Sequence, residues 1–338
     1  MEGMKSMYNT SNDTNPNNDG PPSSSSSSSL TIWQALSLGI LVLEMIVGTF
    51  MNGLMVTVNL FSLVTHRTLG SCDSILTCLG LSRFTFMWVV ALMYFVSYLV
   101  PNTDMVTNLQ YAWLFFNSLS LWLATWLSTF YCVRIVNIRR YIFTVFKAHF
   151  DRLLPFFILA CIAVSSVCCN SAAFTSINQT FNMSRFDNHK NSTPFAAFGT
   201  NFAVFMSLSL ASSMPPFFLF CISAGLVVAS LLKHMNKMKD QERTGFREPS
   251  LDAHYRAVKM MVAFFMFFSL YLIAFILYGS GNLGTGAAGC IAAFFIGAYP
   301  SVHSGLLVIG NPKLKRTLLV ILQKLHCYQK EVIQSISD

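Results

Sequence analysis

Seven long apolar segments constrain this chain more than any other feature of its sequence. A helix needs about 20 consecutive, mostly apolar residues to cross the hydrocarbon core of a bilayer, and each of the seven is long enough. Because a spanning segment must satisfy its own backbone hydrogen bonds, these runs predict an all-α membrane protein, a seven-transmembrane helix bundle. The segments are Ile32–Val64, Asp73–Leu99, Leu109–Ile138, Leu153–Ile177, Asn201–Leu232, Val258–Tyr278 and Ala287–Ile309.

The positions of the cations predict the orientation of the bundle. Only 11% of the residues are charged, against about 25% in soluble proteins. The net charge of +8 is spread over short loops between apolar segments, so it indicates membrane topology and not nucleic-acid binding. The segments expected outside carry only Lys5, Arg185 and Lys190. This bias favours an N-terminus outside the cell and a cytosolic C-terminus.

Three regions divide the chain. Residues 1–30 are polar and rich in Asn, Ser and Pro, a composition that predicts a disordered extracellular tail. Residues 31–310 form the seven-transmembrane domain. Residues 311–338 alternate apolar and basic positions at helical spacing, which predicts a short amphipathic helix on the inner membrane face and a cytosolic tail. Cys327, behind that helix, is a candidate for palmitoylation.

Asn-x-Ser/Thr sequons agree with this orientation. Asn178, Asn182 and Asn191 each begin such a tripeptide, and all three lie between the fourth and fifth segments. The charge bias places that loop outside, where glycosylation takes place. We therefore expect glycosylation in this loop, at one or more of these three sequons.

Polar side chains inside the apolar segments are costly and therefore informative. Asn52 and Arg83 lie at comparable depths in the first and second segments, and His303 lies near that depth in the seventh. These three residues form either a polar cluster that fixes helix packing or a switch whose hydrogen bonds differ between two states. Glu44, in the outer half of the first segment, either faces a water-filled cavity or pairs with a neighbouring helix, and the sequence does not choose.

The third segment has an aromatic outer end and a basic inner end. Trp113, Asn117, Ser120, Ala124 and Ser128 follow at spacings of three or four, so they share one helix face. Small and polar residues in such a stripe are typical of packing against neighbouring helices, which suits Ala124 and Ser128 best. Trp113 and Asn117 either line a pocket for an organic ligand or belong to an interfacial aromatic anchor.

Signals of catalysis are poor. The run from Gly284 to Gly289 matches a dinucleotide-binding glycine pattern, but no strand precedes it and no acidic partner follows about 20 residues on. The nine cysteines lack metal-ligand spacing, and no paired metal histidines or serine nucleophile motif appears. We expect neither an enzyme nor a metal or cofactor site.

Several motifs occur in order, each at a consistent membrane depth. They are Glu44 with Asn52-Gly53, the run Asp73-Ser-Ile-Leu-Thr-Cys-Leu-Gly-Leu-Ser-Arg83, the end of the third segment Phe130-Tyr-Cys-Val-Arg134, Tyr299-Pro-Ser-Val-His-Ser304, and Gly310-Asn-Pro-Lys-Leu-Lys315. From about residue 44 to 317 the chain thereby resembles the bitter taste receptors (taste receptor type 2), a family of G-protein-coupled receptors. Arg134 stands where that family usually has Lys, and the N-terminal extension is longer than the family norm.

The resemblance implies a chemosensory receptor in the plasma membrane, surrounded by lipid. Small-molecule bitter agonists would bind in the outer half of the bundle, and a heterotrimeric G protein, gustducin-like or inhibitory, would bind at the inner ends. The ligand-binding positions implied by the resemblance are Tyr94, Trp113, Asn117, Tyr271 and Ala293. The G-protein-coupling positions are Tyr131, Arg134 and His234.

Two other functions were weighed. A vomeronasal type 1 pheromone receptor is the alternative within receptors, although the contexts of His303 and Phe130-Tyr131 favour bitter taste. A transporter or channel would predict internal repeats or several acidic residues in the spans, and the sequence has neither.

Overall fold

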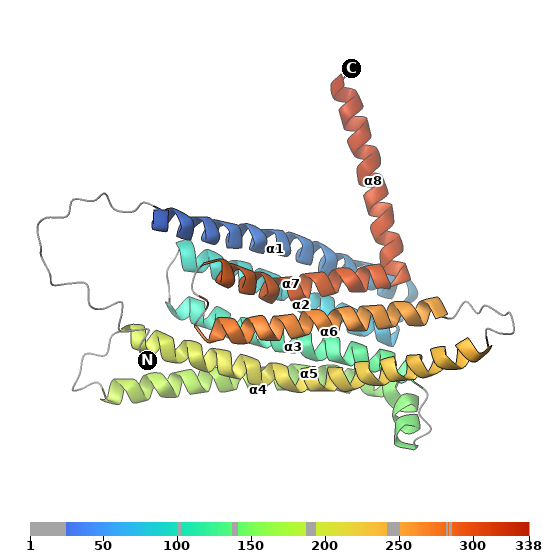
Figure 1. Ribbon diagram of the computed structural model, residues 1–338, viewed down its shortest axis with the longest axis horizontal. Coiled ribbons are helices and arrows are strands. Elements are labelled where there is room, and N and C mark those ends of the chain that lie inside the picture. Colours follow the sequence, from blue (N-terminus) through green and yellow to red (C-terminus); the bar gives the residue numbers. More distant parts are fainter. Residues whose placement is uncertain are drawn as a thin grey trace, which may run out of the picture.

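The computed structural model describes residues 25–99, 103–136, 141–186, 194–241, 251–281, 283 and 286–337, most of them with their side chains. Within these ranges the regular elements are α-helices (Figure 1), as expected. In chain order they are α1 (Ser25–His66), α2 (Ser71–Leu99), α3 (Thr103–Ile135), α4 (Tyr141–Phe186), α5 (Pro194–Gln241), α6 (Leu251–Gly279), α7 (Ala287–Gly310) and α8 (Pro312–Ser337).

Each of the seven apolar segments falls on one of the first seven helices, so the predicted bundle is confirmed. Several helices extend beyond their segments: α4 covers Tyr141–Phe186, whereas the apolar run covers Leu153–Ile177. Hydropathy reports only the part of a helix inside the hydrocarbon core, while backbone hydrogen bonds continue the helix past it. For the same reason α1 begins at Ser25, within the polar region expected to be disordered.

The third helix is the one whose surface is least adapted to lipid. Among the described helices, six are long and apolar enough to cross a membrane, and α3 is not one of them. It packs against α2, α4, α5 and α6, and the polar stripe residues Asn117, Ser120 and Ser128 are buried. A helix that contacts other helices does not need a continuous apolar surface. The polar stripe read from the sequence therefore marks α3 as the central helix.

The first and last spanning helices close the bundle. The first seven helices lie alongside one another (Figure 1), and α1 packs against both α2 and α7. A methyl group on Gly48 of α1 would come within 2.6 Å of Ser301 Oγ on α7, so glycine permits this close approach. Ser301 Oγ in turn donates a hydrogen bond to the backbone oxygen of Glu44 at 3.0 Å.

The amphipathic helix predicted after the seventh span is α8, and its first turn is anchored to the bundle. Asn311 Oδ1 accepts hydrogen bonds from the backbone nitrogens of Lys313 (3.0 Å) and Leu314 (3.4 Å), the geometry of an N-terminal cap. Leu314 is fully buried. Lys313 Nζ donates to Asn59 Oδ1 on α1 (3.2 Å) and lies 3.3 Å from Asp73 Oδ2 on α2. From this anchor α8 leaves the bundle at an angle (Figure 1).

Leu318 and Ile321 of α8 still pack against the core, but beyond Ile321 the bundle does not cover the apolar face of this helix. Leu322 and Leu325 are exposed, on the face expected to meet the membrane surface. Cys327 is exposed as well, so the fold leaves its thiol accessible for acylation, which stays a prediction.

Replacing Lys313 with methionine tests the anchor. We expect Lys313→Met to destabilise the first two turns of α8 by about 1 kcal/mol, because Asn59 and Asp73 lose their cation. Amide hydrogen exchange of that segment should become about fivefold faster. Lys315→Met is the matched control, because Lys315 is exposed and should leave exchange unchanged. Equal exchange in the two variants would contradict the anchor.

Candidate functional site

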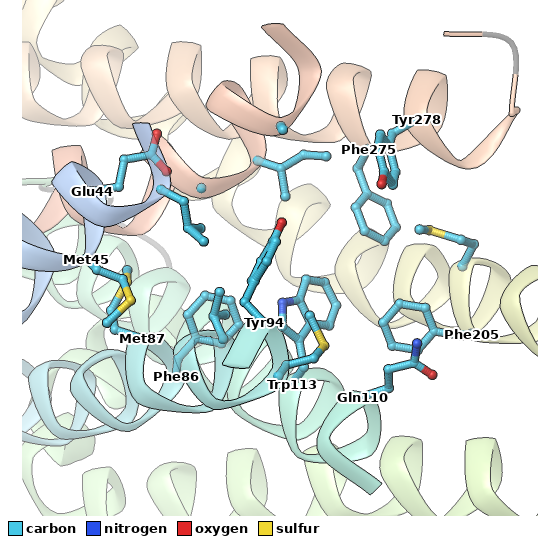
Figure 2. A pocket seen from close by; sticks show the side chains of 17 residues that line it. Glu44, Met45, Phe86, Met87, Tyr94, Gln110, Trp113, Phe205, Phe275 and Tyr278 are labelled. Atoms are coloured by element: carbon cyan, nitrogen blue, oxygen red, sulfur yellow. The ribbon is translucent and has the colours of Figure 1, made fainter. Parts of the chain in front are cut away.

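A cavity of about 270 Å³ lies at the end of the bundle that the charge bias places outside (Figure 2). Its walls come from α1, α2, α3, α5, α6 and α7. Three of the predicted ligand-binding residues line it: Tyr94, Trp113 and Ala293. A cavity between helices with mostly apolar walls is the usual setting for a small organic ligand.

Trp113 is the centre of the aromatic wall. It is only 8% exposed. The centre of its ring lies 5.8 Å from the ring centre of Phe86 and 5.3 Å from that of Phe205. It stacks on Phe275 at 5.9 Å with an angle of 9° between the planes. Because aromatic rings pack with preferred geometries, these neighbours hold the indole in place. The sequence alternative of an interfacial anchor does not fit a side chain buried this deeply.

Asn117 and Tyr271 lie together, outside the cavity lining. Asn117 Nδ2 donates a hydrogen bond to the Tyr271 hydroxyl at 3.0 Å, and both side chains are buried. Tyr271 stacks on Phe275 at 5.7 Å, and Phe275 stacks on Trp113. The pair is therefore joined to the cavity through Phe275. A ligand contact with Asn117 or Tyr271 stays a prediction.

Asn52 and Arg83 belong to one buried network, joined by a residue that the sequence reasoning did not assign to it. Arg83 Nη1 donates to Ser304 Oγ at 3.2 Å and Nη2 donates to the Tyr299 hydroxyl at 3.3 Å. Ser304 Oγ donates to Asn52 Oδ1 at 2.8 Å, and Asn52 Nδ2 donates to Gly48 O at 2.7 Å. Because Arg83, Asn52 and Ser304 come from α2, α1 and α7, the network ties these three helices together.

His303 contacts this network through Tyr299, the two ring centres lying 6.4 Å apart. Its ring lies 4.0 Å from that of Phe264, and no described side chain pairs with its Nδ1. It lines a second, smaller cavity of about 20 Å³, together with Ser128 and Tyr131. Neighbouring helix positions differ by about 100° around the axis, so His303 and Ser304 cannot both face Arg83. The sequence motif did not reveal which one does.

The predicted cytosolic end carries an exposed ion pair that links three helices. Arg134 Nη2 on α3 donates to both carboxylate oxygens of Asp151 on α4, at 3.1 and 3.0 Å. Ser71 Oγ on α2 donates to Asp151 Oδ1 at 2.6 Å. Tyr131 is half-buried, its hydroxyl 3.8 Å from Cys72 Sγ. The side chain of His234 lies outside the described residues.

One predicted glycosylation position is described. Asn178 lies near the C-terminal end of α4 and is exposed, as an acceptor side chain must be. The side chain of Asn182, and Asn191 altogether, lie outside the described residues. Modification at all three stays a prediction.

Comparison with solved structures gives the class of protein. Squid rhodopsin, in its crystal structure, aligns with a TM-score of 0.57 at 14% sequence identity, over 86% of this chain and 80% of the rhodopsin chain. The chain therefore has the seven-helix fold of a G-protein-coupled receptor.

Comparison of sequences gives the family. The model of the family Taste receptor protein (TAS2R) matches residues 30–326, and the chain belongs to this taste receptor type 2 family. Taste receptor type 2 member 4 of Homo sapiens is 30% identical over 295 residues, 84% of this chain and 94% of that protein. Member 124 of Rattus norvegicus is 30% identical over 308 residues, 89% and 97% of the two chains. Member 119 of Mus musculus is 32% identical over 299 residues, 85% and 86%.

Family membership decides between the functions weighed from the sequence. The chain is a multi-pass receptor of the plasma membrane and not an enzyme. The match to the taste receptor type 2 family favours a taste receptor over a vomeronasal receptor or a transporter.

Replacing Ser304 with alanine tests the Arg83 network. The variant leaves a fully buried guanidinium with one bond fewer, and we expect a loss of about 2 kcal/mol of unfolding free energy. The thermal unfolding temperature of the purified receptor should fall accordingly. Ser166→Ala is the control, because the exposed Ser166 hydroxyl bonds its own helix at Ile162 O. A network of no energetic importance would give both variants the same unfolding temperature.

Proposed function

We propose that this receptor binds small organic bitter agonists in the outer cavity and activates a heterotrimeric G protein, gustducin-like or inhibitory, through its inner face. Tyr94, Trp113 and Ala293 contact the agonist directly. Asn117 and Tyr271 act from beneath Phe275, by fixing the position of the aromatic wall.

One observation carries the proposal: a column of rings runs from the cavity to the buried network. Trp113 stacks on Phe275, Phe275 on Tyr271, and the Tyr271 ring lies 5.2 Å from that of Tyr299. Tyr299 then accepts a hydrogen bond from Arg83. An agonist that displaces the Trp113 ring changes the packing of the next ring, because close-packed interiors do not deform continuously. The column supports coupling between the cavity and α7.

At the inner end, the exposed Arg134 side chain supports a contact with the G protein. The side chains of Arg134 and Asp151 are 54% and 56% exposed, and ion pairs this exposed contribute about 0–1 kcal/mol. A partner protein with its own carboxylate or backbone carbonyls can therefore replace Asp151 as the acceptor of Arg134, because little free energy is lost when the exposed ion pair breaks. The Arg134 guanidinium also lies 5.3 Å from the Phe130 ring centre, which keeps it at the mouth of the bundle.

Filling the cavity tests the binding half of the proposal. Ala293→Phe places a ring in the cavity, and Trp113→Ala removes its central wall. We expect each to weaken agonist potency by about tenfold or more in a calcium assay with a chimeric G protein, at equal surface expression. The matched controls are Ala287→Phe, at an exposed position on the same helix, and Trp88→Ala, a 55% exposed tryptophan on α2. If the cavity variants and their controls show the same agonist potency, the agonist does not bind in this cavity. Silence of the wild-type receptor toward a broad bitter panel, with surface expression proven, would contradict the function itself.

Arg134→Ala tests the coupling half. We expect G-protein activation to fall by about tenfold, while agonist affinity measured on purified receptor changes by less than about threefold. Arg152→Ala removes a neighbouring exposed cation and should leave activation unchanged. If both variants reduce activation equally, general surface charge and not Arg134 accounts for the effect.

A further inference from the structure

Glu44 is the feature of the cavity that agonist binding in general does not explain. Among the described side chains that line the cavity, it is the one with an ionisable carboxyl or amine. Figure 2 shows it on the α1 side, across the cavity from Tyr278, with Tyr94 and Trp113 between them. A taste receptor needs apolar walls and a few hydrogen-bonding groups for a neutral ligand. A carboxylate in that wall points to a more specific ligand chemistry.

The carboxylate is held in place but lacks a partner. The Glu44 side chain is only 9% exposed, and a methyl group on Gly297 of α7 would overlap its carboxylate, so α7 fits closely against it. Its Oε1 is buried and has no hydrogen-bond partner among the described residues. The sequence left open whether Glu44 faces a cavity or pairs with a helix; it lines the cavity.

The buried cation of the bundle does not serve as that partner. Arg83 donates to Ser304 and Tyr299. Asn52, whose side chain represents α1 in this network, is two helical turns from Glu44, about 12 Å along the axis. A buried carboxylate without a cation or donor is costly, so a ligand that supplies one gains from binding there.

The rest of the cavity suits the body of such a ligand. Trp113 and its stacked neighbours Phe86 and Phe275 present ring faces, which attract both apolar groups and cations. We propose that Glu44 forms a subsite for the ammonium group of amphiphilic amines, whose aromatic or aliphatic part packs against the Trp113 wall. This inference rests on the proposed ligand-binding role of the cavity.

A matched pair of probes tests the subsite. 4-Phenylbutylamine carries an ammonium group at neutral pH, and 4-phenylbutan-1-ol replaces it with a hydroxyl of similar size. Binding is measured directly on the purified full-length receptor in nanodiscs, without G protein. We expect the wild type to bind the amine about tenfold more tightly than the alcohol, and 4-phenylbutyltrimethylammonium, a permanent cation, to retain part of that preference.

Substitutions at Glu44 assign the preference. Glu44→Gln should abolish it by weakening amine binding while alcohol binding changes by less than about threefold. Glu44→Asp keeps the charge and should keep the preference. Tyr278→Phe, at the opposite side of the cavity, should leave the amine-to-alcohol ratio unchanged. The ligand-free Glu44→Gln receptor should unfold at no lower temperature than the wild type, since an unpartnered carboxylate is replaced.

The outcomes separate the subsite from the function on which it rests. Equal binding of amine and alcohol by the wild type, a preference that survives Glu44→Gln, or a lower unfolding temperature of that variant would each overturn the subsite. Calcium responses to neutral agonists without any amine preference would overturn the subsite and leave the proposed function standing. Amine-selective binding without calcium responses to any probe would support the subsite and contradict the signalling role.

Discussion

The burial of one cation, Arg83, is the constraint on which the arrangement of α1, α2 and α7 depends. A guanidinium inside the membrane is costly unless its donors are paired. Here the pairing groups are neutral and come from α7, where Ser304 and Tyr299 accept its bonds, and Ser304 passes the link on to Asn52 of α1. Removing α7 would leave both Nη atoms of Arg83 without acceptors and Asn52 Oδ1 without its donor. The close approach of α1 and α7 at Gly48 brings the same two helices together.

Tyr299 gives this polar network a second role, because it is also the lower end of the aromatic column. Its hydroxyl accepts from Arg83, while its ring packs near those of Tyr271, Phe268 and Phe264. A change in ring packing below Trp113 therefore acts on the group that satisfies a buried charge. An agonist shifts such an equilibrium only by its difference in affinity for the two arrangements.

The sequence predicted those parts of the fold that follow from one helix at a time. Apolar length located the seven spans, and the alternation of apolar and basic positions in residues 311–338 predicted α8, since both patterns belong to a single segment. The pairing of side chains between helices depends on their rotation and depth, which no local pattern contains. Hence Trp113 lines the cavity, whereas Asn117 bonds Tyr271 outside the cavity lining. The serine that joins Asn52 to Arg83 was missed beside the more conspicuous His303.

The bundle holds two buried groups of opposite formal charge, Glu44 and Arg83, that do not pair with each other. A direct ion pair would satisfy both side chains, and it would leave the cavity without an acid and α7 without its hold on α2. Neutral acceptors pair with the two Nη atoms of Arg83 instead, although its buried Nε has no partner among the described residues, and Glu44 lines the cavity without a cation beside it. The two residues therefore have separate roles. Arg83 holds helices together within the protein, and Glu44 is proposed to receive its partner from the ligand. On the ammonium proposal, ligand selectivity is therefore a consequence of how the structural cation is paired.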